Sequence, residues 1–82
     1  MFVHMTKQVG CSPCDALEPE IRAYCLTNNI AYIVDWKENM STDELSSITG
    51  YPYFYIKNDA GSVVEEFTTA DINEFKTKYE AL

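Results

Sequence analysis

The stretch VGCSPCDALEP, from Val9 to Pro19, decides how this chain is interpreted. It carries two of the three cysteines, Cys11 and Cys14, with two residues between them. Ser12 and Pro13 suit the first positions of a helix, so a helix is expected to begin near Cys11. Three interpretations of the cysteine pair are open: a redox pair that exchanges disulfides, half of a metal site, or an inert helix start.

Size and composition favour one small globular domain over residues 1–82. The apolar share is 46% of 82 residues, which is ordinary for a folded chain and too high for a disordered one. No apolar run is long enough to span a membrane, and the N-terminal segment lacks the pattern of a signal peptide. We therefore expect a cytoplasmic protein, and the odd number of cysteines argues against a disulfide-stapled secreted scaffold.

The charge balance excludes two classes of partner. The net charge is −7, with thirteen acidic residues against six basic ones that are scattered along the chain. A nucleic-acid or anionic-membrane surface needs clustered positive charge. We expect no nucleic acid and no membrane among the partners, and we expect a monomer.

The rest of the chain alternates between strand and helix patterns. A strand is predicted over residues 2–5, a loop over 6–10, a helix from Cys11 to about Asn28, and a strand over 30–36. The segment STDEL has the capping-box pattern of a helix start at Ser41 and predicts a short helix to about Ile48.

The last part of the chain predicts a hairpin and a helix. Strands are expected over residues 51–56 and 62–67 around a short turn, and a final helix is expected to be capped by Thr68 or Thr69. The order β-α-β-α-β-β-α predicts an α/β fold with a four-stranded mixed sheet and helices on both faces. The inward helix positions are Leu17, Ile21, Tyr24 and Cys25, then Ile72, Phe75, Tyr79 and Leu82.

The placement of the cysteines favours redox chemistry. At a helix N-terminus, free backbone N–H groups and the helix dipole favour a thiolate, which is the nucleophile in disulfide exchange, so Cys11 is the predicted nucleophile. Lys7, in the predicted loop, would lower the pKa of Cys11 if it folded back over the sulfur, whereas Asp15 would act in the opposite direction. Cys14 is predicted to resolve a mixed disulfide held on Cys11, and Pro13 stiffens the turn between them.

A zinc site is the main alternative. Zinc takes four ligands, and only Cys25 and His4 remain as candidates. Cys25 falls on the apolar face of the predicted helix and His4 lies within a strand, so we predict structural roles for both and no metal.

Three features together resemble the thioredoxin/glutaredoxin superfamily: CSPC, which looks like the thioredoxin C-G-P-C, Pro19 eight residues after Cys11, and TGYP at residues 49–52. The order of elements is similar to the minimal, glutaredoxin-like form of the thioredoxin fold. The resemblance covers essentially the whole chain. It implies that Pro52 is a cis-proline facing the cysteines and that the backbone of Tyr51 pairs with the substrate.

The chain also differs from the family. Gly10 replaces the tryptophan that usually precedes the first cysteine of thioredoxins, and no acid is identified on a core strand. The stretch VVEEFTTAD lacks the glycine pair with which glutaredoxins hold glutathione, although Lys7 resembles a glutaredoxin lysine that faces a glutathione carboxylate. The ring of Tyr51 is expected to shape the substrate groove.

The sequence therefore predicts a thiol–disulfide oxidoreductase that reduces protein disulfides through the Cys11 and Cys14 dithiol, which becomes a redox-active disulfide, with no tightly bound cofactor. The resemblance implies thioredoxin reductase or glutathione as reductant, and ribonucleotide reductase as one kind of client. A glutathione-dependent glutaredoxin and a non-catalytic thioredoxin-fold binding module are the alternatives. The predicted substrate-binding residues are Lys7, Ser12, Pro13, Tyr51 and Pro52.

Overall fold

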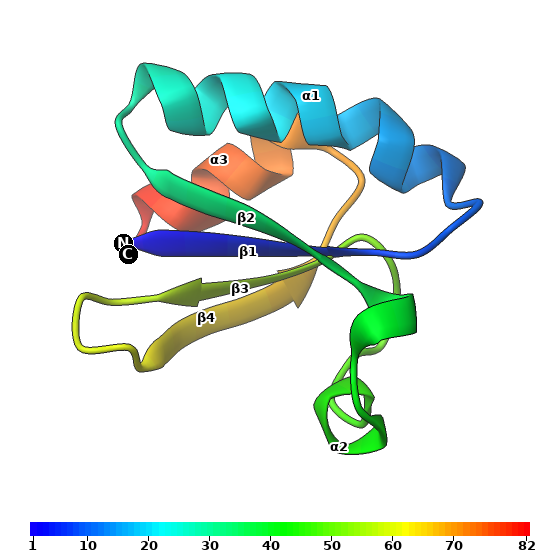
Figure 1. The fold of residues 1–82 in the computed structure, drawn as a ribbon. Helices are drawn as coiled ribbons and strands as arrows, with labels where there is room; N and C mark the ends of the chain where they lie inside the picture. The colour runs from blue at the N-terminus through cyan, green and yellow to red at the C-terminus, as the bar shows by residue number, and fades with distance from the viewer.

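A four-stranded mixed sheet forms the centre of the computed structural model, which describes all of residues 1–82. Strand β1 (Phe2–Lys7) pairs in parallel with β2 (Ala31–Trp36) and antiparallel with β3 (Tyr53–Lys57). Strand β4 (Val63–Thr68) pairs antiparallel with β3, which gives the strand order β2-β1-β3-β4 (Figure 1). The predicted mixed sheet and hairpin are confirmed.

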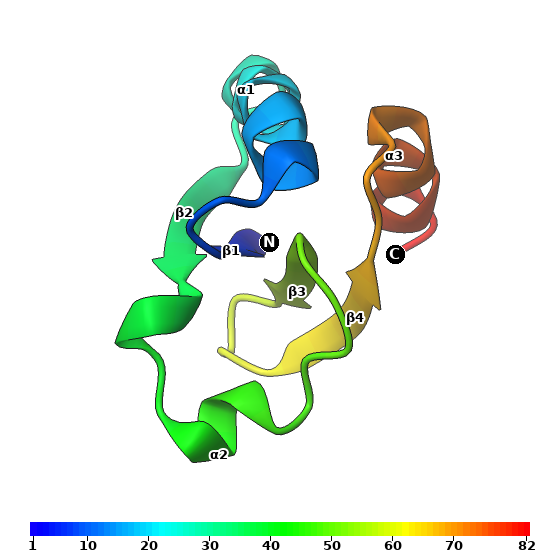
Figure 2. The ribbon, with the colours of Figure 1, turned by 90° about the vertical axis from the view of Figure 1, so that its right-hand side faces the viewer.

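The helices lie on both faces of the sheet, as predicted. Helix α1 (Ser12–Thr27) links the two parallel strands and lies beside α3 (Ile72–Glu80) on one face. Helix α2 (Thr42–Leu45), preceded by the 3-10 turn η1 (Lys37–Asn39), lies on the opposite side (Figures 1 and 2). The element order β-α-β-α-β-β-α is confirmed. No helix combines the length and apolar character needed to cross a membrane.

The core lies between the sheet and the helix pair α1 and α3. Alternate residues of β1 and β3 point to this face, and α1 buries Leu17, Ile21 and Cys25 against them, as its helical spacing predicts. Phe75 of α3 packs against Phe54, with ring centroids 5.0 Å apart. Of the predicted inward positions, Leu82 is wrong, because it lies beyond the end of α3 and is exposed.

Several element ends differ from the sequence prediction. Strand β1 continues through Lys7, because its ladder with β2 runs to the pair Lys7 and Trp36, so the predicted loop over residues 6–10 is two residues too long. The capping box at Ser41 is present, but α2 ends at Leu45. The cap of α3 is neither Thr68 nor Thr69 but Asp71, whose side chain accepts a hydrogen bond from the backbone N–H of Asn73 at 2.8 Å.

Candidate functional site

A disulfide joins Cys11 and Cys14, whose Cα atoms are 5.3 Å apart. Only 8% of Cys11 is exposed, and Cys14 is completely buried beneath it. A thiol of another protein therefore reaches the bond only at Cys11. The two cysteines lie on one helical turn, but only Cys11 is accessible from solvent.

The residues at the start of α1 produce this arrangement through local interactions. Cys11 is the N-cap of α1, and its Sγ accepts a hydrogen bond from the backbone N–H of Cys14 at 3.2 Å. Gly10 before it has a φ of 81°, in the left-handed region that glycine tolerates best. Ser12 and Pro13 form the exposed first turn, where proline's missing N–H leaves no hydrogen bond unmade. An anionic sulfur on Cys11 would face these amide groups directly.

The segment before β3 lies against the same region. The Tyr51–Pro52 peptide bond is cis. Pro52 is buried, and its carbonyl accepts a hydrogen bond from the Thr68 hydroxyl at 2.7 Å. Tyr51 is half-buried and packs against the core cluster that contains both disulfide cysteines. The Lys37 ammonium lies 5.8 Å from the centroid of the Tyr51 ring.

Lys7 lies elsewhere than the sequence predicts. It ends β1 instead of lying in a loop, and its side chain is only 7% exposed. Its Nζ is 3.2 Å from Oδ1 of Asp15 and 3.7 Å from Oε1 of Glu18, and it lies 5.0 Å from the centroid of the Trp36 ring. The sequence left open whether Lys7 folds back over the Cys11 sulfur; in the structure its ammonium is held by two carboxylates of α1.

Sequence reasoning missed two members of this ion cluster. The Glu18 carboxylate contacts Lys7 and also pairs with Arg22 four residues along α1. The spacing of Glu18 and Arg22 is the ordinary helical ion-pair spacing and was visible in the sequence. Its connection to β1 was not, because it depends on how α1 crosses the sheet.

The residues considered for zinc do not come together. No group of three or more His, Cys, Asp or Glu side chains is placed to hold a metal ion. His4 lies among the stacked rings of Phe2 and Tyr55, with its Nδ1 3.0 Å from Oδ2 of Asp35. Cys25 is buried in the core, and burial raises the pKa of its thiol to about 11. Both residues have the structural roles predicted for them.

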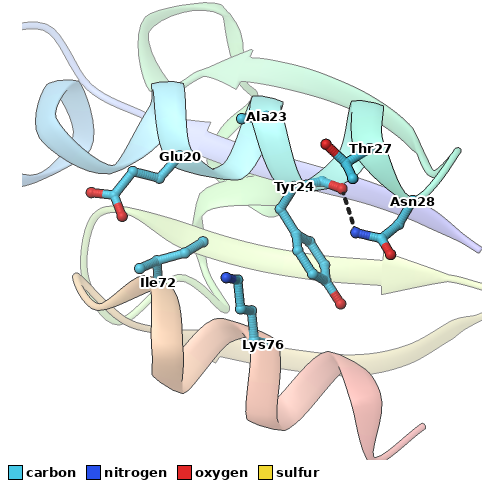
Figure 3. Close-up of a pocket in the computed structure, with 7 residues that line it drawn as sticks. All are labelled: Glu20, Ala23, Tyr24, Thr27, Asn28, Ile72 and Lys76. Atoms are coloured by element: carbon cyan, nitrogen blue, oxygen red, sulfur yellow. Dashed lines mark hydrogen bonds between the residues drawn. The ribbon is translucent and has the colours of Figure 1, made fainter.

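A cavity of about 520 Å³ lies between α1 and α3 (Figure 3). Glu20 and Tyr24 line it from α1, and Lys76 lines it from α3. Burial and the Glu80 carboxylate, which accepts a 2.9 Å hydrogen bond from the Tyr24 hydroxyl, raise the pKa of Tyr24 to about 12. No cysteine, histidine or serine lines this cavity.

Comparison with known proteins gives a likeness of fold. Thioredoxin 1 of the thermophilic eubacterium Thermosipho africanus superposes with a TM-score of 0.83 at 23% identity, covering 99% of this chain and 92% of that one. Thioredoxin f2 of Chlamydomonas reinhardtii gives 0.78 at 20% identity, covering 98% and 76%. A thioredoxin f2 in complex with ferredoxin:thioredoxin reductase gives 0.79 at 22% identity, covering 98% and 74%.

No family model matches the sequence, and no curated protein matches it either. The structural likeness nevertheless extends over nearly the whole chain. The chain therefore has the thioredoxin fold in a short form, with a disulfide at the start of its first helix. The predicted fold class is confirmed.

Proposed function

We propose that the protein is a thiol–disulfide oxidoreductase that reduces disulfides of other proteins through Cys11 and Cys14. The observation that carries the proposal is the asymmetric disulfide at the start of α1, with Cys11 at the surface and Cys14 buried. A thioredoxin fold with this arrangement is consistent with disulfide exchange. Cys25, the remaining cysteine, is buried in the core.

The exchange takes two balanced steps. In the reduced protein, the Cys11 thiolate attacks one sulfur of the client disulfide; the client S–S bond breaks, and the second client sulfur leaves as a thiolate that takes up a proton. Cys14 then loses its proton and attacks Sγ of Cys11, which releases the first client sulfur as a thiolate that also takes up a proton. The client gains two electrons and two protons, and this protein is left with the Cys11–Cys14 disulfide. A separate reductant must return two electrons.

Unpaired backbone at Tyr51 supports a docking role for this residue. Pro52 has no N–H, and the Pro52 carbonyl is taken by Thr68. The backbone N–H and C=O of Tyr51 make no hydrogen bond within the chain. An extended client segment can therefore add to this segment as a strand does to a sheet edge, with Ser12, Pro13 and the Tyr51 ring as its neighbours.

The reductant in this proposal is an enzyme of the thioredoxin-reductase kind. A thioredoxin f2 with this fold is seen in complex with ferredoxin:thioredoxin reductase, at 22% identity to this chain. Glutathione is the alternative electron donor. The engagement of Lys7 by Asp15 and Glu18 counts against it, because that lysine was the cation expected to meet a glutathione carboxylate.

The experiment is reduction of insulin disulfides, coupled either to NADPH with thioredoxin reductase or to glutathione with glutathione reductase. Activity is expected with thioredoxin reductase and is expected to be lost in Cys11→Ser. Cys14→Ser should accumulate a mixed disulfide with the client, and Cys25→Ser is the matched control that keeps full activity. Absence of activity with both reductants, with Cys11 and Cys14 reduced and reactive, would favour a non-catalytic binding module.

A further inference from the structure

The two edge strands of the sheet differ in how they are protected. Strands β2 and β4 lie at opposite sides of the sheet, and each has one side without a neighbour (Figure 2). The pairing of β4 with β3 shifts register between Ile56 and Lys57, and β4 carries Glu65 and Glu66. The backbone N–H of Glu66 also donates to the Glu65 carboxylate at 2.9 Å. Irregular pairing and charged side chains block an edge strand against another chain, so β4 is protected.

Strand β2 has none of these protective features. Its ladder with β1 is regular over six residue pairs, and its sequence AYIVDW contains no proline, glycine or lysine. Alternate residues of a strand turn their N–H and C=O groups away from the neighbour, and no backbone–backbone hydrogen bond outside the ladder involves residues 31–36. Ile33, in the middle of the strand, is 43% exposed. A regular, apolar and unpaired edge of this kind is a site where a further strand can add.

The charges beside this edge are few and are of both signs. Only Asp35 of the thirteen acidic residues lies on β2, and its Oδ2 accepts a 2.6 Å hydrogen bond from the Tyr55 hydroxyl. Glu18 and Arg22 of α1 lie close to β2, since both act on Tyr32: burial raises the pKa of Tyr32 most, Glu18 raises it further, and Arg22 lowers it. The Arg22 side chain is 62% exposed. An acid and a base thus lie along α1 next to the open edge.

We propose that β2 is a self-association edge, at which a second copy of this chain adds antiparallel about a two-fold axis at Ile33. In this register Ile33 meets its own counterpart, Tyr32 meets the partner's Val34, and Ala31 meets the partner's Asp35. No like charges lie opposite each other, and the central pair is apolar. The two four-stranded sheets become one continuous sheet, and the outward N–H and C=O groups of β2 gain partners.

The same two-fold axis makes the helices complementary. Neighbouring strands lie about 4.8 Å apart, so two copies paired at β2 bring their α1 helices side by side on one face of the sheet. The axis reverses the direction of α1 in the second copy. The row formed by Glu18 and Arg22 therefore faces itself in the opposite order, with acid toward base.

The two edges also select this pairing over the other one that the sheet offers. Adding β2 of one copy to β4 of another would bring Asp35 toward Glu65 and Glu66, which repel it. It would also leave an open edge at each end and continue as a filament, whereas pairing of β2 with β2 closes after two copies. The proposal departs from the monomer expected from the sequence, because the difference between the edges is visible only in the sheet.

Sedimentation equilibrium tests the proposal, with dithiothreitol present so that no intermolecular disulfide contributes. Between about 10 μM and about 1 mM protein, the mass should rise from that of one chain to that of two, because a single strand pair with one helix row is a small, weak interface. Added salt should strengthen the association, since each copy carries a net charge of −7 and salt screens their repulsion.

Matched variants locate the interface. Ile33→Lys places two like charges on the axis and should weaken the association about tenfold or more. Val64→Lys makes the same change on β4, where Val64 is 41% exposed, and should leave the association unchanged. Arg22→Glu removes the base from the α1 row and should also weaken it, whereas Lys76→Glu on α3 is its control. If Ile33→Lys fails to fold, the comparison of Arg22→Glu with Lys76→Glu decides.

Hydrogen exchange shows which strand is covered. Amides of β2 should exchange more slowly in concentrated than in dilute protein, and amides of β4 should not change. A single chain at all concentrations, species larger than two chains, equal association of the edge variants, or slowed exchange at β4 would each overturn the proposal. No client or reductase is used, so the result does not depend on the proposed function.

Discussion

Cys25 shows how burial decides the chemistry of a single thiol. It is 1% exposed on the inner face of α1, and burial raises its pKa to about 11, because the charged thiolate loses its hydration there. We therefore predict that iodoacetamide at pH about 8 modifies reduced Cys11 quickly and leaves Cys25 unmodified, because the thiolate is the reactive form. Mass spectrometry of the alkylated protein measures this.

The control is the same reaction in denaturant, where the third thiol should become reactive together with Cys14. Rapid labelling of Cys25 in the folded protein would show that α1 opens from the sheet. Cys25→Ala, which removes the thiol, should leave the labelling of Cys11 unchanged.

Residues whose role is local could be predicted from the sequence, and residues whose role depends on distant partners could not. The start of α1 near Cys11 follows from Ser12 and Pro13 beside it. The surroundings of Lys7 depend on α1 and on Trp36 of β2, which the sequence separates from it by up to 29 residues. The sequence could therefore predict the cysteine pair but not the ion cluster next to it.

At the scale of the elements, one hydrogen bond ties α1 to α3. The Tyr24 hydroxyl donates to Glu80 at 2.9 Å, and the Tyr24 ring meets Phe75 and Tyr79 edge-on. The pKa of Tyr24 is raised from 10.0 to about 12. The neutral hydroxyl therefore stabilises the folded protein fully below pH about 10, and this contribution is lost as the pH rises from about 10 to about 12. Tyr24→Phe should flatten the fall in the free energy of unfolding over that range.

Denaturant unfolding at a series of alkaline pH values measures this fall. Glu80→Gln is the matched variant: it removes the acceptor's charge, so it should give a slope between those of the unaltered protein and Tyr24→Phe. Parallel losses of stability in the unaltered protein and Tyr24→Phe would contradict a role for Tyr24 in alkaline unfolding.

Element boundaries were predicted where a cap is a local pattern. The box formed by Ser41 and Glu44 has reciprocal hydrogen bonds of 3.2 Å and 2.9 Å and fixes where α2 begins. The end of β1 was predicted too early. Pairing with β2 continues the strand to Lys7, and no local sequence pattern indicates that pairing. Asp71 rather than a threonine caps α3, since the Thr69 hydroxyl accepts a hydrogen bond from the Asp71 backbone N–H instead.

On the scale of the whole molecule, the small core makes the redox state matter for stability. Only 16 of the 82 residues are buried, so the protein has a narrow margin against unfolding and a change of a few kcal/mol is a large part of it. The proposed reaction forms and breaks one covalent crosslink within the chain, the disulfide between Cys11 and Cys14. Each turnover would therefore change the stability of the entire fold.

Oxidised protein should be more stable than reduced protein. Cys11 and Cys14 are three residues apart, and a crosslink closing so short a loop restricts the unfolded chain by roughly 2 kcal/mol in the loop-entropy account. In a domain of this size that corresponds to a melting temperature higher by roughly 10 °C. Calorimetry with and without dithiothreitol measures the difference, and a Cys11→Ser/Cys14→Ser double variant should melt at one temperature under both conditions. Equal melting temperatures of the oxidised and reduced protein would mean that interactions gained on reduction, such as those of a Cys11 thiolate with the helix amides and Lys7, offset the lost crosslink completely.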